Sequence, residues 1–201
     1  MKALILVDIQ NDFCPGGNLA VKDGDKIIPL VNQLQKQKDY DLIIATQDFH
    51  PKNHKSFASN NSGKSVGELG ELNGQPQVMW PDHCVQGSIG AEFHKDLDMN
   101  KIVKIFKKGT NPEVDSYSGF FDNDHKSSTG LGEYLKSKNI LMVDVVGLAL
   151  DYCVKATAMD ANNLGFITTV IVPATRAVNL NVDDDLKAIA ELKKSGVLIY
   201  E

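Results

Sequence analysis

The 201 residues are 42% hydrophobic and 23% charged, a balance typical of one compact domain over residues 1–201 that buries roughly 70% of its unfolded surface. Asp and Glu outnumber Lys and Arg by 26 to 21. The resulting net charge of -5 argues against nucleic acid and anionic membranes as partners held by bulk electrostatics.

No segment has the pattern of a targeting or membrane sequence. The apolar opening, residues 3–7, is interrupted by Asp8 and is too short for a signal-peptide core or a membrane span. Three cysteines, Cys14, Cys84 and Cys153, form an odd set without a CxxC pair. Such a set fits a reducing compartment better than a disulfide framework, so we expect a cytoplasmic protein.

Short runs rich in Val, Ile and Leu alternate with helix-length segments. The expected strands are residues 3–7, 42–45, 102–106, 141–146, 167–172 and 197–200, and the expected helices are residues 26–38, 152–164 and 184–194. Near-continuous apolarity suits strands buried on both faces, and the alternation predicts a parallel sheet. The prediction is an α/β fold of three layers, a doubly wound, mostly parallel six-stranded sheet with helices on both faces.

One long segment, about residues 51–95, breaks this alternation. It is rich in Gly, Asn, Ser and Pro and has few periodic apolar positions, yet it contains Trp80 and His83. Long loops inside compact domains are usually functional or disordered. The aromatic and histidine content favours a functional loop that forms part of a metal or substrate site.

Reactive side chains follow four of the predicted strands. Asp8 ends the first, Asp48 and His50 follow the second, Lys107 and Lys108 follow the third, and Cys153 follows the fourth after a short turn. Ligands of an open parallel sheet bind outside the carboxyl ends of its strands. We therefore expect these side chains to meet at one edge of the sheet.

Cys153 is a candidate nucleophile. It lies where a helix is expected to begin, and a thiol at a helix N-terminus beside a cation has a lowered pKa. Asp8 and Lys108 are placed to accept the proton and to hold the anion, and backbone N–H groups of residues 147–153 could form an oxyanion hole. The alternative is a buried apolar cysteine, which is the interpretation for Cys14 and Cys84.

Asp48 and His50 are candidate metal ligands. Their side chains point the same way because strand faces alternate with a period of two, and His83 could complete the site. Two imidazoles and one carboxylate suit Zn, Fe or Mn better than Mg or Ca. The alternative is a set of surface loop histidines, and His54 is a weaker candidate than His83.

Phe13 and Trp80 are large apolar side chains in predicted loops, where exposure is costly. One interpretation is that they hold a flat ring between them. The other is that they pack over the edge of the sheet as part of the core.

Several of these segments together match the pattern of a known family. In this order they resemble the nicotinamidases (pyrazinamidases) of the isochorismatase-like cysteine hydrolases, over about residues 2–178. The segments are residues 8–13 (DIQNDF), 47–51 (QDFHP), 80–85 (WPDHCV), 106–109 (FKKG), 115–122 (DSYSGFFD) and 147–154 (GLALDYCV).

The resemblance implies roles for individual residues. The implied triad is Cys153 as nucleophile, Asp8 as general base and acid and Lys108 as the orienting cation, with Lys107 a bystander. The implied metal ligands are Asp48, His50 and His83, with Ser56 or His54 behind them. The implied oxyanion hole is made by the amides of Ala149 and Cys153, beside a cis peptide bond between Ala149 and Leu150. The implied substrate contacts are Phe13, Trp80, Tyr117, Ala149 and Leu150, and Leu150 departs from the Thr that the family often has there.

The resemblance also implies an activity. It is the hydrolysis of the carboxamide of nicotinamide to nicotinate and ammonia through a cysteine thioester, in NAD salvage, with pyrazinamide as a second substrate. One divalent ion, zinc before iron or manganese, is the implied cofactor. The implied partner is the small substrate, without nucleic acid or membrane, and a second copy of the chain stays open as a further partner.

Three alternatives remain at this point. A related hydrolase acting on a carbamoyl or ureido amide, or on a vinyl ether, would keep the fold without needing the metal ligands. A binding protein could keep the pocket with an inert Cys153. In a third alternative the metal rather than the thiol generates the nucleophile.

Overall fold

The computed structural model describes residues 1–201 and is built around one six-stranded sheet, in which every neighbouring pair of strands is parallel. The strand order across the sheet is β5-β2-β1-β6-β7-β8. The bounds are β1 (Lys2–Val7), β2 (Leu42–Asp48), β5 (Lys104–Lys108), β6 (Met142–Leu148), β7 (Ile167–Arg176) and β8 (Leu198–Tyr200). The six predicted strands are therefore confirmed, and the chain order reverses across β1 as a doubly wound sheet requires.

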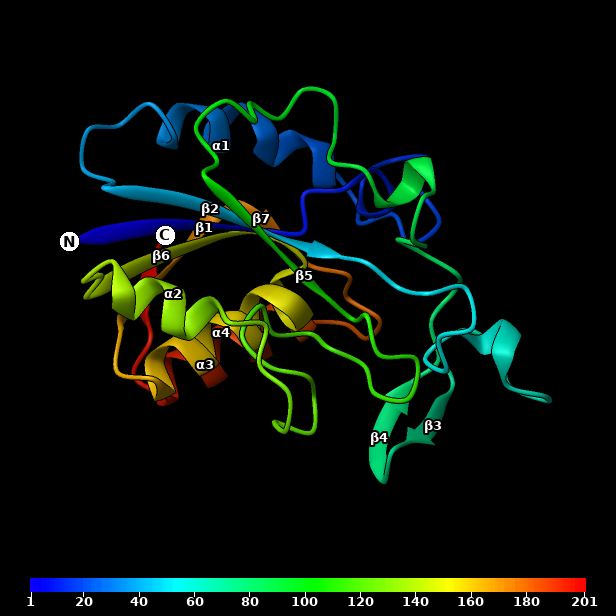
Figure 1. Cartoon of the computed structure of the whole chain (residues 1–201). Helices are drawn as coiled ribbons and strands as arrows, with labels where there is room; N and C mark the ends of the chain where they lie inside the picture. The colour runs from blue at the N-terminus through cyan, green and yellow to red at the C-terminus, as the bar shows by residue number, and fades with distance from the viewer.

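Helices cover both faces of this sheet (Figure 1), as predicted. Helix α1 (Ile28–Leu34) lies on one face, and α2 (Leu131–Ser137), α3 (Lys155–Asn163) and α4 (Asp184–Lys194) lie on the other. The predicted helix over residues 26–38 is shorter because residues Gly24–Ile27 form a separate 3-10 turn and the apolar pattern ends at Leu34. Helix α2 was not predicted. No helix is both long and apolar enough to cross a membrane.

The central strand β1 is buried on both faces because alternate side chains enter two different cores. Ala3, Ile5 and Val7 pack in the core under α2, α3 and α4, whereas Leu4 and Leu6 pack in the core under α1. All five side chains are completely buried. This explains why the sequence of β1 is continuously apolar rather than alternating.

The segment of residues 51–95 lies outside the six-stranded sheet and contains secondary structure of its own. It contains an antiparallel hairpin, β3 (Leu69–Leu72) and β4 (Gln75–Val78), which projects at the end of the molecule towards which β2 runs (Figure 1). The hairpin was not predicted because its strands are short and largely exposed, so they lack an apolar pattern.

Gly147 lies near the end of β6, where the pairing with β7 shifts register between Val145 and Gly147. Its φ of +119° suits only glycine, and a Cβ atom added there would lie 2.1 Å from the backbone oxygen of Val7. A side chain at this position would push β6 away from β1, next to the turn that carries Cys153.

We therefore expect Gly147→Ala to destabilise the protein. The control is Gly63→Ala, because Gly63 also has a positive φ, +77°, but a Cβ atom added there would have no atom within 4 Å. In urea unfolding, Gly147→Ala should lose about 1–3 kcal/mol more than Gly63→Ala, which is the usual cost of overpacking. Equal losses in the two variants would contradict the close approach of β6 and β1.

Candidate active site

The side chains that follow the strands meet around the ammonium group of Lys108. Its Nζ lies 2.9 Å from Asp8 Oδ2, 3.0 Å from Asp48 Oδ1 and 3.4 Å from Cys153 Sγ. The strands β5, β2, β1 and β6 are consecutive in the sheet, so their carboxyl ends bring these four residues together. The structure thus places Asp8, Lys108 and Cys153 in one group.

Lys108 is a buried cation held by two buried carboxylates. Burial alone would lower the pKa of Lys108, but Asp48 and Asp8 raise it well above its usual value. The group therefore stays an ammonium ion, and it also donates to the carbonyl of Ser116 at 2.9 Å. The neighbouring Lys107 is exposed and lies over the ring of Phe49 instead, so only Lys108 enters the site.

The structure corrects one expectation about Cys153. Burial raises the pKa of its thiol well above the usual range, and Lys108 only partly opposes this. The expected lowering fails because the thiol is almost completely enclosed, so desolvation and the negative charges of Asp8 and Asp48 outweigh one cation. Cys153 therefore rests as a thiol, and a base must take its proton before it can attack.

Cys153 lies in a wide helical turn, Leu150–Val154, that leads from β6 into α3. The residue before this turn, Ala149, has an extended backbone, and its N–H donates to no acceptor in the protein. A free amide beside the thiol is the kind of donor that an oxyanion hole needs. Ala149 also lines the cavity described below.

Two expectations about this turn are wrong. The cis peptide bond joins Leu148 to Ala149 rather than Ala149 to Leu150. The side chain of Leu150 packs in the hydrophobic core with Val154 and does not line the cavity, so it is not placed to contact a substrate there.

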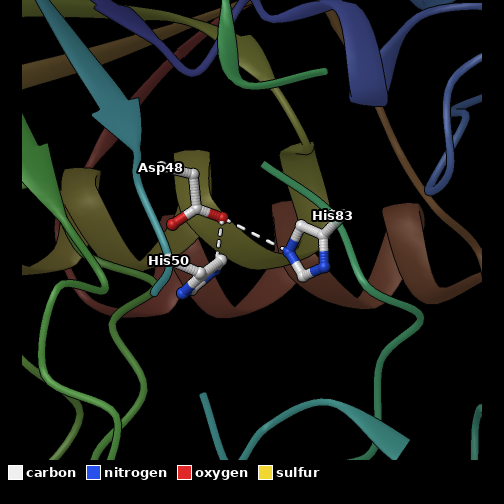
Figure 2. A group of neighbouring side chains, drawn as sticks. All are labelled: Asp48, His50 and His83. Carbon is white, nitrogen blue, oxygen red and sulfur yellow. Dashed lines mark hydrogen bonds and ion pairs between the residues drawn. The ribbon is translucent and has the colours of Figure 1, made fainter. Parts of the chain in front are cut away.

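Asp48, His50 and His83 form a buried cluster (Figure 2). Asp48 Oδ2 lies 3.0 Å from His50 Nε2 and 3.4 Å from His83 Nε2. The other ring nitrogens face backbone carbonyls, His50 Nδ1 that of Gly109 at 2.9 Å and His83 Nδ1 that of Pro81 at 2.8 Å. These contacts fix the rings with both Nε2 atoms facing the carboxylate, an arrangement typical of metal-binding histidines.

The donor atoms of this cluster fit a divalent ion. One atom from each of the three residues lies within 4.8 Å of the others, and two imidazoles with a carboxylate suit a first-row transition metal. Asp48 is shared, since its Oδ1 pairs with Lys108 and its Oδ2 faces the histidines. His54 lies behind His50, with 4.4 Å between ring centroids, and its Nδ1 bonds Ser56 Oγ at 2.8 Å.

His54 also belongs to a second group, together with His50 and Asp115. Burial and the neighbouring His50 lower the pKa of His54 to about 4, so its ring is neutral. Asp115 was not singled out from the sequence, although it opens the segment of residues 115–122 that carries the resemblance. Its carboxylate is buried and accepts from Gln77 at 2.9 Å.

A cavity opens directly onto the thiol and the metal cluster. It is partly open to solvent and is lined mostly by apolar side chains. Its lining residues are Phe13, Leu19, Asp48, Trp80, His83, Asp115, Tyr117, Ala149, Tyr152, Cys153 and Val178. The structure therefore places Phe13, Trp80 and Tyr117 in the cavity wall, as expected.

Several wall residues were missed from the sequence. Leu19 and Val178 are ordinary apolar residues of irregular segments, and no sequence pattern distinguishes them. Tyr152 could have been found, because it directly precedes Cys153. Its ring packs edge to face against the ring of Trp80, with 5.0 Å between the ring centroids. Trp80 Nε1 in turn donates a hydrogen bond to the hydroxyl of Tyr117 at 3.1 Å.

Comparison with known sequences matches residues 2–200 to the Isochorismatase domain family. The nicotinamidase of Escherichia coli is 46% identical over 201 residues, which cover 99% of this chain and 94% of the relative.

Solved structures give the same result. The yeast nicotinamidase bound to the inhibitor nicotinaldehyde superposes with a TM-score of 0.95 at 34% identity, covering 100% of both chains. The pyrazinamidase of Pyrococcus horikoshii in complex with zinc superposes with a TM-score of 0.80 at 38% identity, covering 100% of this chain and 98% of that one. The chain therefore belongs to the isochorismatase family.

Proposed function

We propose that this protein is a nicotinamidase, an amidohydrolase that converts nicotinamide to nicotinate and ammonia. The observation that carries the proposal is that Cys153, Asp48 and His83 line the same cavity. Behind Cys153, Lys108 contacts both its sulfur and the carboxylate of Asp8. The 46% identical nicotinamidase supports nicotinamide as the substrate. A 38% identical nicotinamidase/pyrazinamidase of Mycobacterium tuberculosis supports pyrazinamide as a second one.

The first half of the reaction transfers the acyl group to the thiol. Because burial keeps Cys153 protonated, Asp8 takes the thiol proton as Sγ attacks the carboxamide carbon. The amides of Ala149 and Cys153 hold the developing oxyanion. The C–N bond then breaks, Asp8 returns the proton to the leaving nitrogen, and ammonia departs from a nicotinoyl thioester.

The second half restores the enzyme. Asp8 accepts a proton from a water molecule as its oxygen attacks the thioester carbon, and the C–S bond breaks to give nicotinate. The proton returns to Cys153 Sγ. Lys108 stays charged throughout and keeps the carboxylate and the sulfur within reach of one another, at 2.9 and 3.4 Å from its Nζ.

Asp48, His50 and His83 would hold one divalent ion, and zinc is the ion we propose, because these ligands suit it and the Pyrococcus relative was solved with it. When bound, the ion supplies a Lewis-acid contact that polarises and orients a ring nitrogen at the cavity wall. The chain's own aromatic residues, Phe13 and Trp80, would hold the faces of the ring and exclude water.

Replacing the nucleophile gives the most direct test. Cys153→Ala should lower ammonia release from nicotinamide by at least about 1,000-fold, because no other group in the cavity can form the thioester. Cys14→Ala is the matched control, since Cys14 is also buried but lines no part of the cavity, and it should retain activity. Wild-type turnover by the Cys153 variant would contradict the covalent mechanism and favour a metal-generated nucleophile.

Metal removal tests the second centre. Chelation should abolish ammonia release, and return of zinc should restore it. His83→Ala should lower both metal affinity and activity by at least about 100-fold. Loss of a residue that only orients a ligand already costs roughly 10- to 100-fold, and His83 would be a ligand itself. His125→Ala is the control, because its side chain is 62% exposed and lies away from the cluster. Full activity in chelated, metal-free protein would instead favour a related hydrolase that needs no metal.

A further inference from the structure

Thr46 is a completely buried residue of β2 whose side chain meets the general base of the proposed reaction. Its hydroxyl donates to Asp8 Oδ1 at 2.6 Å. It does not line the cavity, so it cannot touch a substrate bound there. We propose that Thr46 is a positioning residue, which holds Asp8 so that its second oxygen faces the thiol of Cys153; this inference rests on the proposed function.

The two oxygens of Asp8 have different surroundings. Oδ1 is engaged by Thr46, whereas Oδ2 lies 2.9 Å from Lys108 Nζ and accepts no well-aligned hydrogen bond. An oxygen with a free lone pair is what a proton acceptor needs. The hydrogen bond from Thr46 therefore determines which oxygen stays available to Cys153.

The backbone of Asp8 does not supply this control by itself. Asp8 follows the last residue of β1 and has a φ of +48°, a left-handed conformation that aspartate adopts more readily than most residues. The backbone therefore places the Cβ atom of Asp8 but leaves the rotation of its carboxylate about χ2 open. Its carboxylate faces three charged or titratable groups, namely Lys108, Asp48 and Cys153. Without the Thr46 hydroxyl, only Lys108 and the Cys153 thiol would be left as side-chain donors, and Asp8 could turn either oxygen towards Lys108.

The methyl group of Thr46 packs against Gly119. A Cβ atom added at Gly119 would lie 2.5 Å from Thr46 Cγ2, so the methyl group of Thr46 fills the space that a side chain would need. With its methyl group seated there, the hydroxyl points to Asp8. Gly119 lies in the segment of residues 115–122. Its lack of a side chain leaves the space that the methyl group of Thr46 occupies.

The first test compares Thr46→Val, which removes the hydroxyl at nearly constant shape, with Thr46→Ser, which keeps it. In the metal-loaded enzyme, Thr46→Val should lower kcat for nicotinamide roughly 10- to 100-fold with KM unchanged, as for a misplaced catalytic group. Thr46→Ser should recover most of the loss. Thr168→Val is the matched control, because Thr168 is also buried and donates to the carbonyl of Phe166. It lies at the start of β7, paired with Val143, at the opposite end of the sheet from the site.

The second test uses Gly119→Ala, which should displace the methyl group of Thr46 and lower kcat in the same way. If both substitutions act through the Thr46 hydroxyl, the double variant with Thr46→Val should be no slower than Thr46→Val alone. Two independent structural defects would multiply instead. Multiplied losses, or a Thr46→Ser variant as slow as Thr46→Val, would overturn the inference.

A third readout does not depend on the substrate. The rate at which iodoacetamide alkylates Cys153 at neutral pH, followed by mass spectrometry, should fall in Thr46→Val and recover in Thr46→Ser. A wild-type enzyme that releases no ammonia from nicotinamide would contradict the proposed function, and the alkylation rates would then decide the inference alone. Equal alkylation of wild type and Thr46→Val would overturn it.

Discussion

The ammonium group of Lys108 is the interaction on which the site depends. A lone buried cation is strongly destabilising, and one made by a completely buried lysine is tolerated only because two carboxylates and a carbonyl surround it. The same constraint works in reverse, since Asp8 and Asp48 could not both be buried and charged without the lysine. The geometry of the proposed catalytic group is therefore also the arrangement that offsets the electrostatic cost of burying Lys108, Asp8 and Asp48.

The parallel sheet makes this arrangement possible. Four consecutive strands end at one edge. Three of them, β5, β2 and β1, supply at or just after their ends a charged group that the core could not hold alone, and β6 leads into the turn that carries Cys153. Side chains two residues earlier on β5 and β1, Phe106 and Leu6, are ordinary core residues. Along each of these strands, the side chains thus change from apolar core residues to polar site residues within a few positions of the strand's end.

Much of this could be predicted from the sequence, because the signals are local. Continuous apolar runs mark buried strands, and the polar residues after them mark the site edge. The predictions that were wrong, and the features that were missed, concern properties that depend on the surroundings of a residue in the folded chain. The pKa of Cys153 is set by enclosure, the inward packing of Leu150 by the helical turn that it begins, and the hairpin of β3 and β4 by pairing between short, exposed strands. Leu19 and Val178 reach the cavity only through tertiary packing.

Asp48 joins the two halves of the site. One of its oxygens pairs with Lys108 and the other faces His50 and His83, so one carboxylate contacts both Lys108 and the histidine cluster. Burial would raise the pKa of Asp48, but His50 and Lys108 hold it well below its usual value, which keeps the shared carboxylate charged. A relative without the metal cluster would therefore still need an anion at this position, because Lys108 would otherwise lose one of its two counter-charges. Loss of the histidines would weaken the hold on the charge of Asp48 but would leave its carboxylate beside Lys108, whereas loss of Asp48 would remove a counter-charge of Lys108 and the partner of both histidines.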